Sequence, residues 1–147
     1  MSVRAFVDTN ILVYSRDKSE EAKQAIALDW LSVLWQQRSG RISSQTLNEF
    51  YVTVTQRLKP GLSRPEAQAD IRSLLLWNPI AVDGTVIENA WLIQERYSFS
   101  WWDSLILSAA QIQDCSYVLS EDMQHGQQIG NMTIINPFLS NVSILDA

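Results

Sequence analysis

Short apolar runs alternate with longer amphipathic segments along most of this chain, and this alternation limits the possible folds. The runs at 3–7, 80–82, 117–119 and 133–135 indicate strands, and 41–43 indicates a further short one. Each run is apolar on both faces, which is typical of parallel strands that helices cover on either side. The sequence therefore predicts an α/β fold with a central parallel sheet and helices on both of its faces.

Between these runs, apolar residues repeat at helical spacing and polar residues mark the expected helix starts. Asp17 with Glu20, or Ser19 alone, can cap a long helix that continues to about Arg38. A helical stripe follows at Leu47, Phe50, Tyr51, Val54 and Leu58. Three more helices are expected to begin at polar pairs, namely Ser63 with Glu66, Thr85 with Glu88, and Ser100 with Asp103.

Length and composition indicate one globular domain. A chain of 147 residues, 46% of them hydrophobic, can bury a core without a disulfide or a structural metal. Its one cysteine, Cys115, is expected to be a buried structural thiol, which suits a reducing compartment. No signal peptide or membrane-spanning run is evident, so we expect a soluble cytoplasmic protein with no membrane partner.

The chain is acidic, with a net charge of −5 and a pI of about 4.7. This charge argues against a protein that binds nucleic acid nonspecifically, because such binding needs a basic field. It does not exclude a nuclease, since divalent cations would neutralise part of an acidic site and local arginines could hold phosphates.

Two aspartates lie where a parallel sheet places its functional sites, beyond the carboxyl ends of the strands. Asp8 directly follows the first expected strand, and Asp122 comes shortly after Leu119. Either aspartate could instead cap a helix or form a turn. Glu121 competes with Asp122 for a functional role, and the pattern alone leaves both open.

Asp103 shares a helical face with Ile106, Leu107 and Ala110, and that face is apolar. A carboxylate on a buried face is costly unless it is paired or bound to a metal, so Asp103 is a candidate functional residue. Periodicity alone treats Glu49 as a solvated glutamate.

A cluster of carboxylates at one sheet edge cannot be fully ionised without a cation. Oxygen ligands suit Mg²⁺ or Mn²⁺, and the scarcity of histidine and cysteine argues against zinc. His125, the only histidine, is expected to be a surface or loop residue. Asp83 also follows an expected strand, but it precedes Gly84 and a helix start, so we interpret it as a turn residue.

Four segments resemble, in order, the acidic motifs of PIN domains, and the fourth has the form common to VapC toxins. They are 6–12 (FVDTNIL), 48–50 (NEF), 100–106 (SWWDSLI) followed by Ala109 and Ala110, and 119–126 (LSEDMQHG). The resemblance covers nearly the whole chain and implies a single PIN domain over 1–147, with its core at about 3–138.

The resemblance also implies a function and a site. It implies a homodimeric endoribonuclease toxin that cleaves RNA and is inhibited by a cognate antitoxin. It places Mg²⁺ or Mn²⁺ at Asp8, Glu49, Asp103 and Asp122 as metal ligands and catalytic residues, which favours Asp122 over Glu121. Asn10 and Ser120 match positions that support these acids.

Other functions remain open at this stage. A phosphohydrolase with Asp8 as nucleophile usually needs a second acid two residues later, where this chain has Asn10. A housekeeping PIN nuclease would keep the same acids without a toxin role. A non-catalytic binding module could use some of the six tryptophans, such as Trp30, Trp35, Trp77 and Trp91. Trp101 and Trp102, beside the acids, could line a groove for an antitoxin or pack in the core.

Overall fold

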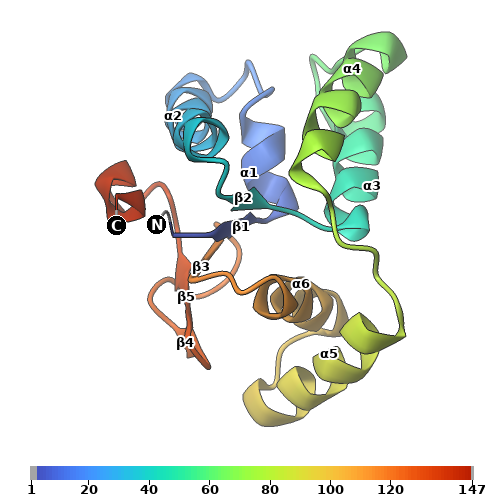
Figure 1. Ribbon diagram of the computed structural model, residues 1–147. Helices are drawn as coiled ribbons and strands as arrows, with labels where there is room; N and C mark the ends of the chain where they lie inside the picture. Colours follow the sequence, from blue (N-terminus) through green and yellow to red (C-terminus); the bar gives the residue numbers. More distant parts are fainter. Residues whose placement is uncertain (1–2, 147) are drawn as a thin grey trace.

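Five short strands form one sheet, and helices pack on both of its faces (Figure 1). The computed structural model describes residues 3–146. The strands are β1 (Ala5–Val7), β2 (Gly40–Arg41), β3 (Tyr117–Leu119), β4 (Gln128–Ile129) and β5 (Met132–Ile135). The α-helices are α1 (Thr9–Tyr14), α2 (Glu21–Gln37), α3 (Ser44–Val52), α4 (Arg64–Leu74), α5 (Gly84–Tyr97) and α6 (Trp101–Ile112). Shorter helical turns are η1 (Thr53–Arg57), η2 (Leu75–Trp77) and η3 (Val142–Leu145).

The strand order is β2-β1-β3-β5-β4, and every neighbouring pair is parallel except β4 with β5. The predicted parallel α/β architecture is therefore confirmed. The strand β4 was not predicted, because two residues are too few to show a pattern. It forms a hairpin with β5, and the turn includes Gly130 at a positive φ of 58°.

The strand predicted at 80–82 is wrong. Ile80 forms only an isolated parallel bridge with Ser43, and the expected strand at 41–43 begins one residue earlier and ends at Arg41. Pro79 lacks a backbone N–H, and the cap of α5 follows at Asp83, so little chain is left for a ladder.

Alternate residues of the central strands divide the core into two halves. Ala5 and Val7 of β1 pack with residues of α1, α2, α3 and α4, whereas Phe6 packs with α5 and α6. Figure 1 shows the same division, with α1 to α4 on one side of the sheet and α5 and α6 on the other. Both faces of these strands are thus buried, which explains their uniformly apolar sequences.

Two of the predicted helix starts are confirmed. The Ser63 hydroxyl accepts from the backbone N–H of Glu66 at 3.2 Å, and the Glu66 carboxylate accepts from the backbone N–H of Ser63 at 3.0 Å. Ser100 caps α6 by accepting from the backbone N–H of Asp103 at 3.2 Å.

The other two predicted caps are wrong. The helix α2 begins after Glu20 without a side-chain cap, because Asp17 accepts instead from the backbone N–H and the hydroxyl of Ser19. The helix α5 starts before Thr85, because Asp83 accepts from the backbone N–H of Val86 at 3.1 Å. Asp83 is therefore a cap, in line with its interpretation as a residue of local structure.

Cys115 and the tryptophans differ in how deeply their side chains are buried. Cys115 is buried, and burial raises the pKa of its thiol to about 12, as expected for a structural cysteine. Trp30 and Trp77 are core residues, while Trp35 and Trp91 are 39% and 56% exposed.

Across residues 3–146, no helix has both the length and the apolar character needed to cross a membrane.

Candidate functional site

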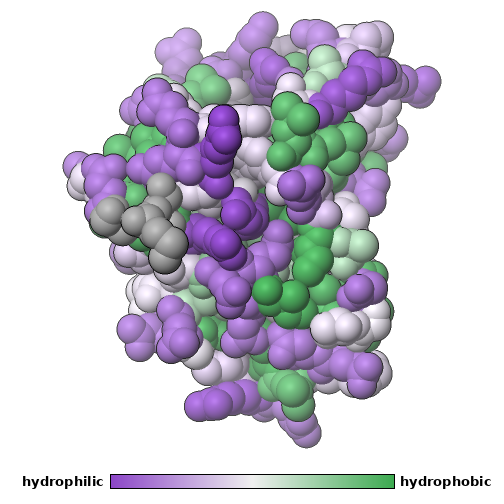
Figure 2. Space-filling view, viewed as in Figure 1, coloured by the Kyte–Doolittle hydropathy of each residue, from purple (hydrophilic) through white to green (hydrophobic). Residues whose placement is uncertain are grey.

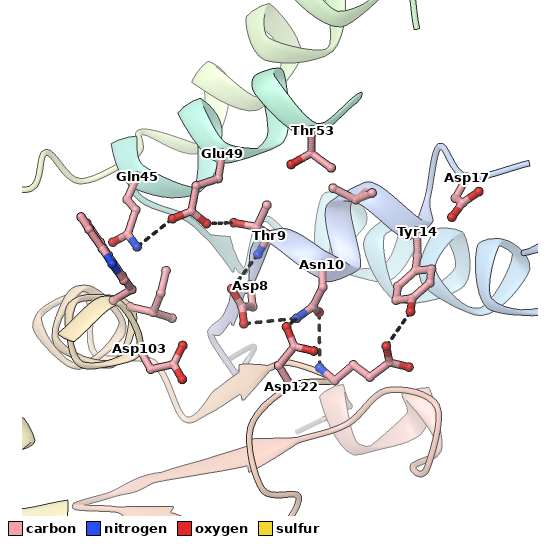
Figure 3. A pocket seen from close by; sticks show the side chains of 14 residues that line it. Asp8, Thr9, Asn10, Tyr14, Asp17, Gln45, Glu49, Thr53, Asp103 and Asp122 are labelled. Atoms are coloured by element: carbon pink, nitrogen blue, oxygen red, sulfur yellow. Dashed lines mark hydrogen bonds between the residues drawn. The ribbon is translucent and has the colours of Figure 1, made fainter. Parts of the chain in front are cut away.

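A cavity of about 430 Å³ lies beyond the carboxyl ends of β1 and β3 (Figure 3). Its walls bring together the four acids that the sequence singled out. Asp8 follows β1, Glu49 lies on α3, Asp103 lies on α6 and Asp122 follows β3. The fold thus gathers four distant chain segments where parallel sheets usually place their sites.

Asp8 is the buried member of this group, with 8% of its surface exposed. Its carboxylate accepts from the backbone N–H of Thr9 at 2.8 Å, which caps α1, and from the Ser120 hydroxyl at 2.7 Å. Burial raises the pKa of Asp8 to about 6; these hydrogen bonds oppose the rise, while the negative charges of Asp103 and Asp122 add to it. Ionised Asp8 is therefore costly unless a cation lies beside it.

Asn10 and Ser120 connect Asp8 to Asp122. The Asn10 amide donates to Asp122 at 3.0 Å and, over a longer 3.4 Å contact, to Asp8. The Ser120 hydroxyl that donates to Asp8 also accepts from the backbone N–H of Asp122 at 3.2 Å. Asn10 and Ser120 therefore hold Asp8 and Asp122 in place just beyond the carboxyl ends of the neighbouring strands β1 and β3. These contacts are of the kind expected of residues that support the acids.

Glu49 lies on the opposite wall, on α3. Its side chain is exposed, as its periodicity indicated, yet it faces the cavity (Figure 3). The Thr9 hydroxyl donates to one of its carboxylate oxygens at 2.9 Å, and the Gln45 amide donates to the other at 2.9 Å. Neutral donors from α1 and α3 thus hold Glu49 beside the pocket.

Asp103 is half-buried in the first turn of α6. Burial raises the pKa of its carboxyl group, a contact with the Ser100 hydroxyl lowers it in part, and the charges of Asp122 and Glu49 raise it further. Ile106, Leu107 and Ala110 are buried as the helical pattern predicted. Asp103 sits where this apolar face meets the cavity.

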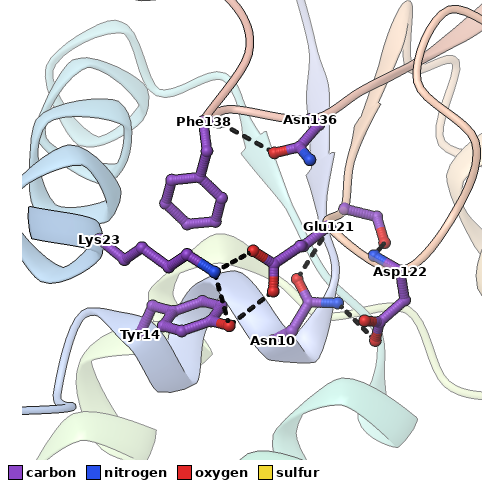
Figure 4. A network of polar contacts seen from close by, with 8 residues as sticks. Asn10, Tyr14, Lys23, Glu121, Asp122, Asn136 and Phe138 are labelled. Carbon is purple, nitrogen blue, oxygen red and sulfur yellow. Dashed lines mark hydrogen bonds and ion pairs between the residues drawn. The ribbon is translucent and has the colours of Figure 1, made fainter. Parts of the chain in front are cut away.

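Glu121, the neighbour of Asp122, has a different environment (Figure 4). Its carboxylate accepts from the Lys23 ammonium at 2.5 Å and from the Tyr14 hydroxyl at 2.5 Å. Partial burial raises the pKa of Glu121, but the hydrogen bonds from Lys23 and Tyr14 outweigh it and leave the pKa below its ordinary value. The Lys23 ammonium also lies 4.9 Å and 5.3 Å from the ring centroids of Tyr14 and Phe138. The negative charge of Glu121 is therefore already paired with the Lys23 ammonium group.

The donor set of the cavity fits a hard divalent cation. Asp8, Asp103 and Asp122 offer only oxygen ligands, which Mg²⁺ and Mn²⁺ prefer, and a cation would lower the cost of ionised Asp8. Within residues 3–146, no three His, Cys, Asp or Glu side chains are yet arranged as ligands of a single ion. Glu49 and Asp122 accept hydrogen bonds from the neutral side chains of Thr9 and Asn10.

Several residues of the cavity were missed by the sequence-based reasoning. They include Thr9, Gln45 and Thr53, whereas Trp102, named above as a residue that could line a groove, does line the cavity. Gln45, Glu49 and Thr53 follow one another at four-residue spacing, so one polar ridge of α3 and η1 was visible in the sequence. Nothing in the pattern showed that this ridge faces the sheet edge.

Solved structures with this fold include a toxin and, from Klebsiella pneumoniae, a toxin–antitoxin complex (TM-score 0.61, 18% identity over 90% of this chain and 97% of its own). VapC20 of Mycobacterium tuberculosis, a sarcin–ricin loop cleaving toxin, superposes with a TM-score of 0.57 and 17% identity over 80% of this chain and 89% of its own. VapBC2 of Rickettsia felis, bound to promoter DNA, gives 0.63 and 18% identity over 88% and 96%. FitAB bound to an IR36 DNA fragment gives 0.69 and 18% identity over 93% and 97%.

A search of curated proteins finds no match. The PIN domain family model matches residues 5–127, which include all four acids and both supporting residues. The match agrees with the order of motifs in the sequence, with the mostly parallel sheet, and with the position of the cavity at its edge. This chain therefore belongs to the PIN-domain family.

Proposed function

We propose that this protein is a divalent-metal-dependent endoribonuclease and the toxin of a toxin–antitoxin pair. The observation that carries the proposal is the convergence of four carboxylates on one cavity, with Asp8 buried and its pKa raised to about 6. Ionisation of these carboxylates is costly without a cation, and their oxygen atoms are suitable ligands for one. Membership of the PIN family and the fold shared with VapC20 support hydrolysis of RNA.

The residues divide into distinct roles in this proposal. Asp8 and Asp103 are the principal ligands of Mg²⁺ or Mn²⁺, and Glu49 and Asp122 complete or orient the ligand shell. When bound, the cation supplies Lewis-acid polarisation of the phosphate and makes a water molecule more acidic. Asn10 and Ser120 hold Asp8 and Asp122 in place through the hydrogen bonds described above.

The proposal of an antitoxin partner rests on the solved structures that share this fold. The toxin–antitoxin complex from Klebsiella pneumoniae shares this fold, which supports a cognate antitoxin for this chain. We also propose a homodimer, as the resemblance to VapC toxins implies. A cytoplasmic location fits an RNA substrate.

Cleavage is expected to need the acids and a metal. Incubation of the purified protein with host RNA should produce new ends in Mg²⁺ or Mn²⁺ and none in EDTA. Asp103→Asn should reduce the rate by about 100-fold or more, because a charged ligand is lost. Asp29→Asn, on the exposed surface of α2, is the matched control and should keep full activity. Full cleavage in EDTA would contradict the proposal, and a non-catalytic binding module would cleave nothing in either buffer.

Asp8→Asn should abolish cleavage yet stabilise the metal-free fold. Because the pKa of Asp8 is raised to about 6 from 3.8, the folded state holds the proton more tightly, so wild-type stability falls as pH rises from about 4 to 6. Asparagine carries no charge and remains a good helix cap. Above pH 6.5 the variant should therefore gain about 1–2 kcal/mol, or a few degrees in Tm.

Thermal melts in EDTA at several pH values check this. The gain should vanish near pH 3.5, where both states of wild-type Asp8 are protonated, and should shrink when Mg²⁺ is added. Asp83→Asn, at the exposed cap of α5, removes the same charge outside the cavity and serves as the control. A lower Tm of Asp8→Asn at pH 7.5 would mean that Asp8 is a structural cap.

The adjacent acids should differ in their effect on activity. Glu121→Gln should keep most of the activity, since the residue pairs with Lys23 and Tyr14, and should cost a little stability. Asp122→Asn should lose most of the activity because it removes a charge that the cation needs. Steady-state cleavage assays on both variants, with Tm values, check the prediction. Equal losses in both would show that the assignment of Asp122 is wrong.

Expression without the antitoxin should stop growth. We expect the wild-type chain to arrest a host that lacks the neighbouring reading frame, and co-expression of that frame to restore growth. Asp8→Asn is the control, expressed to the same level, and should be harmless. Normal growth and intact RNA with soluble, metal-loaded wild-type protein would favour a housekeeping PIN nuclease instead.

A further inference from the structure

A second groove, of about 530 Å³, adjoins the acidic cavity. Both are lined by Thr9, Gln45, Glu49, Thr53 and Trp102, and the groove continues along α3 and η1 to Arg57. Figure 3 shows Gln45, Glu49 and Thr53 along one side of the helix, across from Asp103. A ligand that enters the acidic cavity can therefore extend into this groove without leaving the surface.

Trp102 forms an aromatic wall of the groove. Its side chain is 64% exposed, whereas Trp30 and Trp77 are buried in the core, so packing does not account for its position. It directly precedes Asp103 in the first turn of α6 and also lines the acidic cavity, together with the candidate metal ligands. Figure 2 shows hydrophobic residues gathered over α6, next to the hydrophilic centre of this face. An exposed indole beside an acidic site is a platform on which a flat ring can stack.

Arg57 supplies a positive charge at the far end of the same groove. It is exposed and takes part in neither of the ion pairs found among residues 3–146. It ends η1, a π-helical turn in which the backbone N–H of Leu58 donates to the Thr53 carbonyl at 2.9 Å. Such turns frequently occur at functional sites. Although the chain has a net charge of −5, the Arg57 guanidinium is a local positive charge that can bind an anion.

Gln45 begins the polar ridge of α3 at the end opposite Arg57 and lines the groove as well. Its amide N–H₂ donates to Glu49, which fixes the orientation of the amide, and its carbonyl oxygen is buried with no donor among the described residues. At its surface the groove thus combines an aromatic face and a cation. This combination matches two parts of a nucleotide, which are a flat base and a phosphate.

We propose that this groove binds the unpaired RNA nucleotides next to the scissile phosphate, with a base stacked on Trp102 and a backbone phosphate held by Arg57. This inference rests on the proposed nuclease function and deepens it, because it assigns substrate binding beside the acidic cavity to Trp102 and Arg57. Bases in a duplex have no free face for Trp102, whereas bases in loops do. Arginine is suited to phosphate through its planar pair of donors.

RNA binding can be tested apart from cleavage. All variants are made in the Asp8→Asn protein, and their affinities for a labelled 12-nucleotide single-stranded RNA of random sequence are measured. Trp102→Ala should weaken binding roughly 5- to 100-fold, as expected for one lost base stack, and Trp102→Phe should restore most of it. Trp91→Ala removes a comparably exposed tryptophan on α5 outside both cavities and should change nothing.

Arg57 is tested by salt dependence. Arg57→Ala should lower the slope of log Kd against log salt concentration by about one, and Arg57→Lys should keep the slope. A 12-base-pair RNA duplex should bind more weakly than the single strand, and Trp102→Ala should not affect it. Neither Trp102 nor Arg57 is buried, so circular dichroism should show that every variant is folded.

The outcomes separate this inference from the proposed function. Equal affinity of the parent and Trp102→Ala overturns the inference even if the wild type cleaves RNA, and so does a parent that binds no RNA. If Trp102→Ala leaves RNA binding intact but weakens the complex with the protein encoded by the neighbouring reading frame, the groove belongs to a protein segment. Absence of cleavage by the wild type with intact stacking on Trp102 would instead overturn only the nuclease proposal.

Discussion

The buried carboxylate of Asp8 is the constraint on which the rest of the site depends. The parallel pairing of β1 with β3 brings Ser120 beside it, and the hydroxyl of Ser120 and the backbone N–H of Thr9 are its closest donors. These neutral donors do not offset the burial, so its pKa remains at about 6. The remaining cost can be removed only by a proton or a cation, which makes the fold selective for positive charge at this edge of the sheet.

Glu121 and Asp122, the two adjacent acids after β3, show how tertiary contacts give similar side chains different environments. The Glu121 carboxylate accepts hydrogen bonds from Tyr14 at the end of α1 and from Lys23 on α2, while Asp122 accepts from Asn10 at the cavity. Asn10 contacts both sides of this division, because its carbonyl accepts from the backbone N–H of Glu121. A carboxylate with its own ammonium group has little need of a metal, which leaves Asp122 as the free charge.

An acidic protein can still approach RNA when its positive charge is placed locally. The chain has 16 acidic and 11 basic residues, so long-range attraction does not bring RNA to it. Arg57 and the exposed ring of Trp102 lie beside the acidic cavity instead. In the proposed groove, binding would depend on short contacts and on unpaired bases, which favours selected RNA segments over bulk RNA.

The sequence by itself determined the α/β class, most of the strands and the acids at their ends, because apolar periodicity and strand-end position are local properties. It also showed Asp103 on an apolar helical face. It failed at 80–82, at β4 and at two helix caps, where a single backbone contact decides among similar local choices. Only the tertiary structure decided that Glu49 faces the cavity, that Glu121 pairs with Lys23, and that Trp102 and Arg57 share a groove. These features depend on contacts between segments far apart in the chain, and no periodicity records which distant side chain a residue will meet.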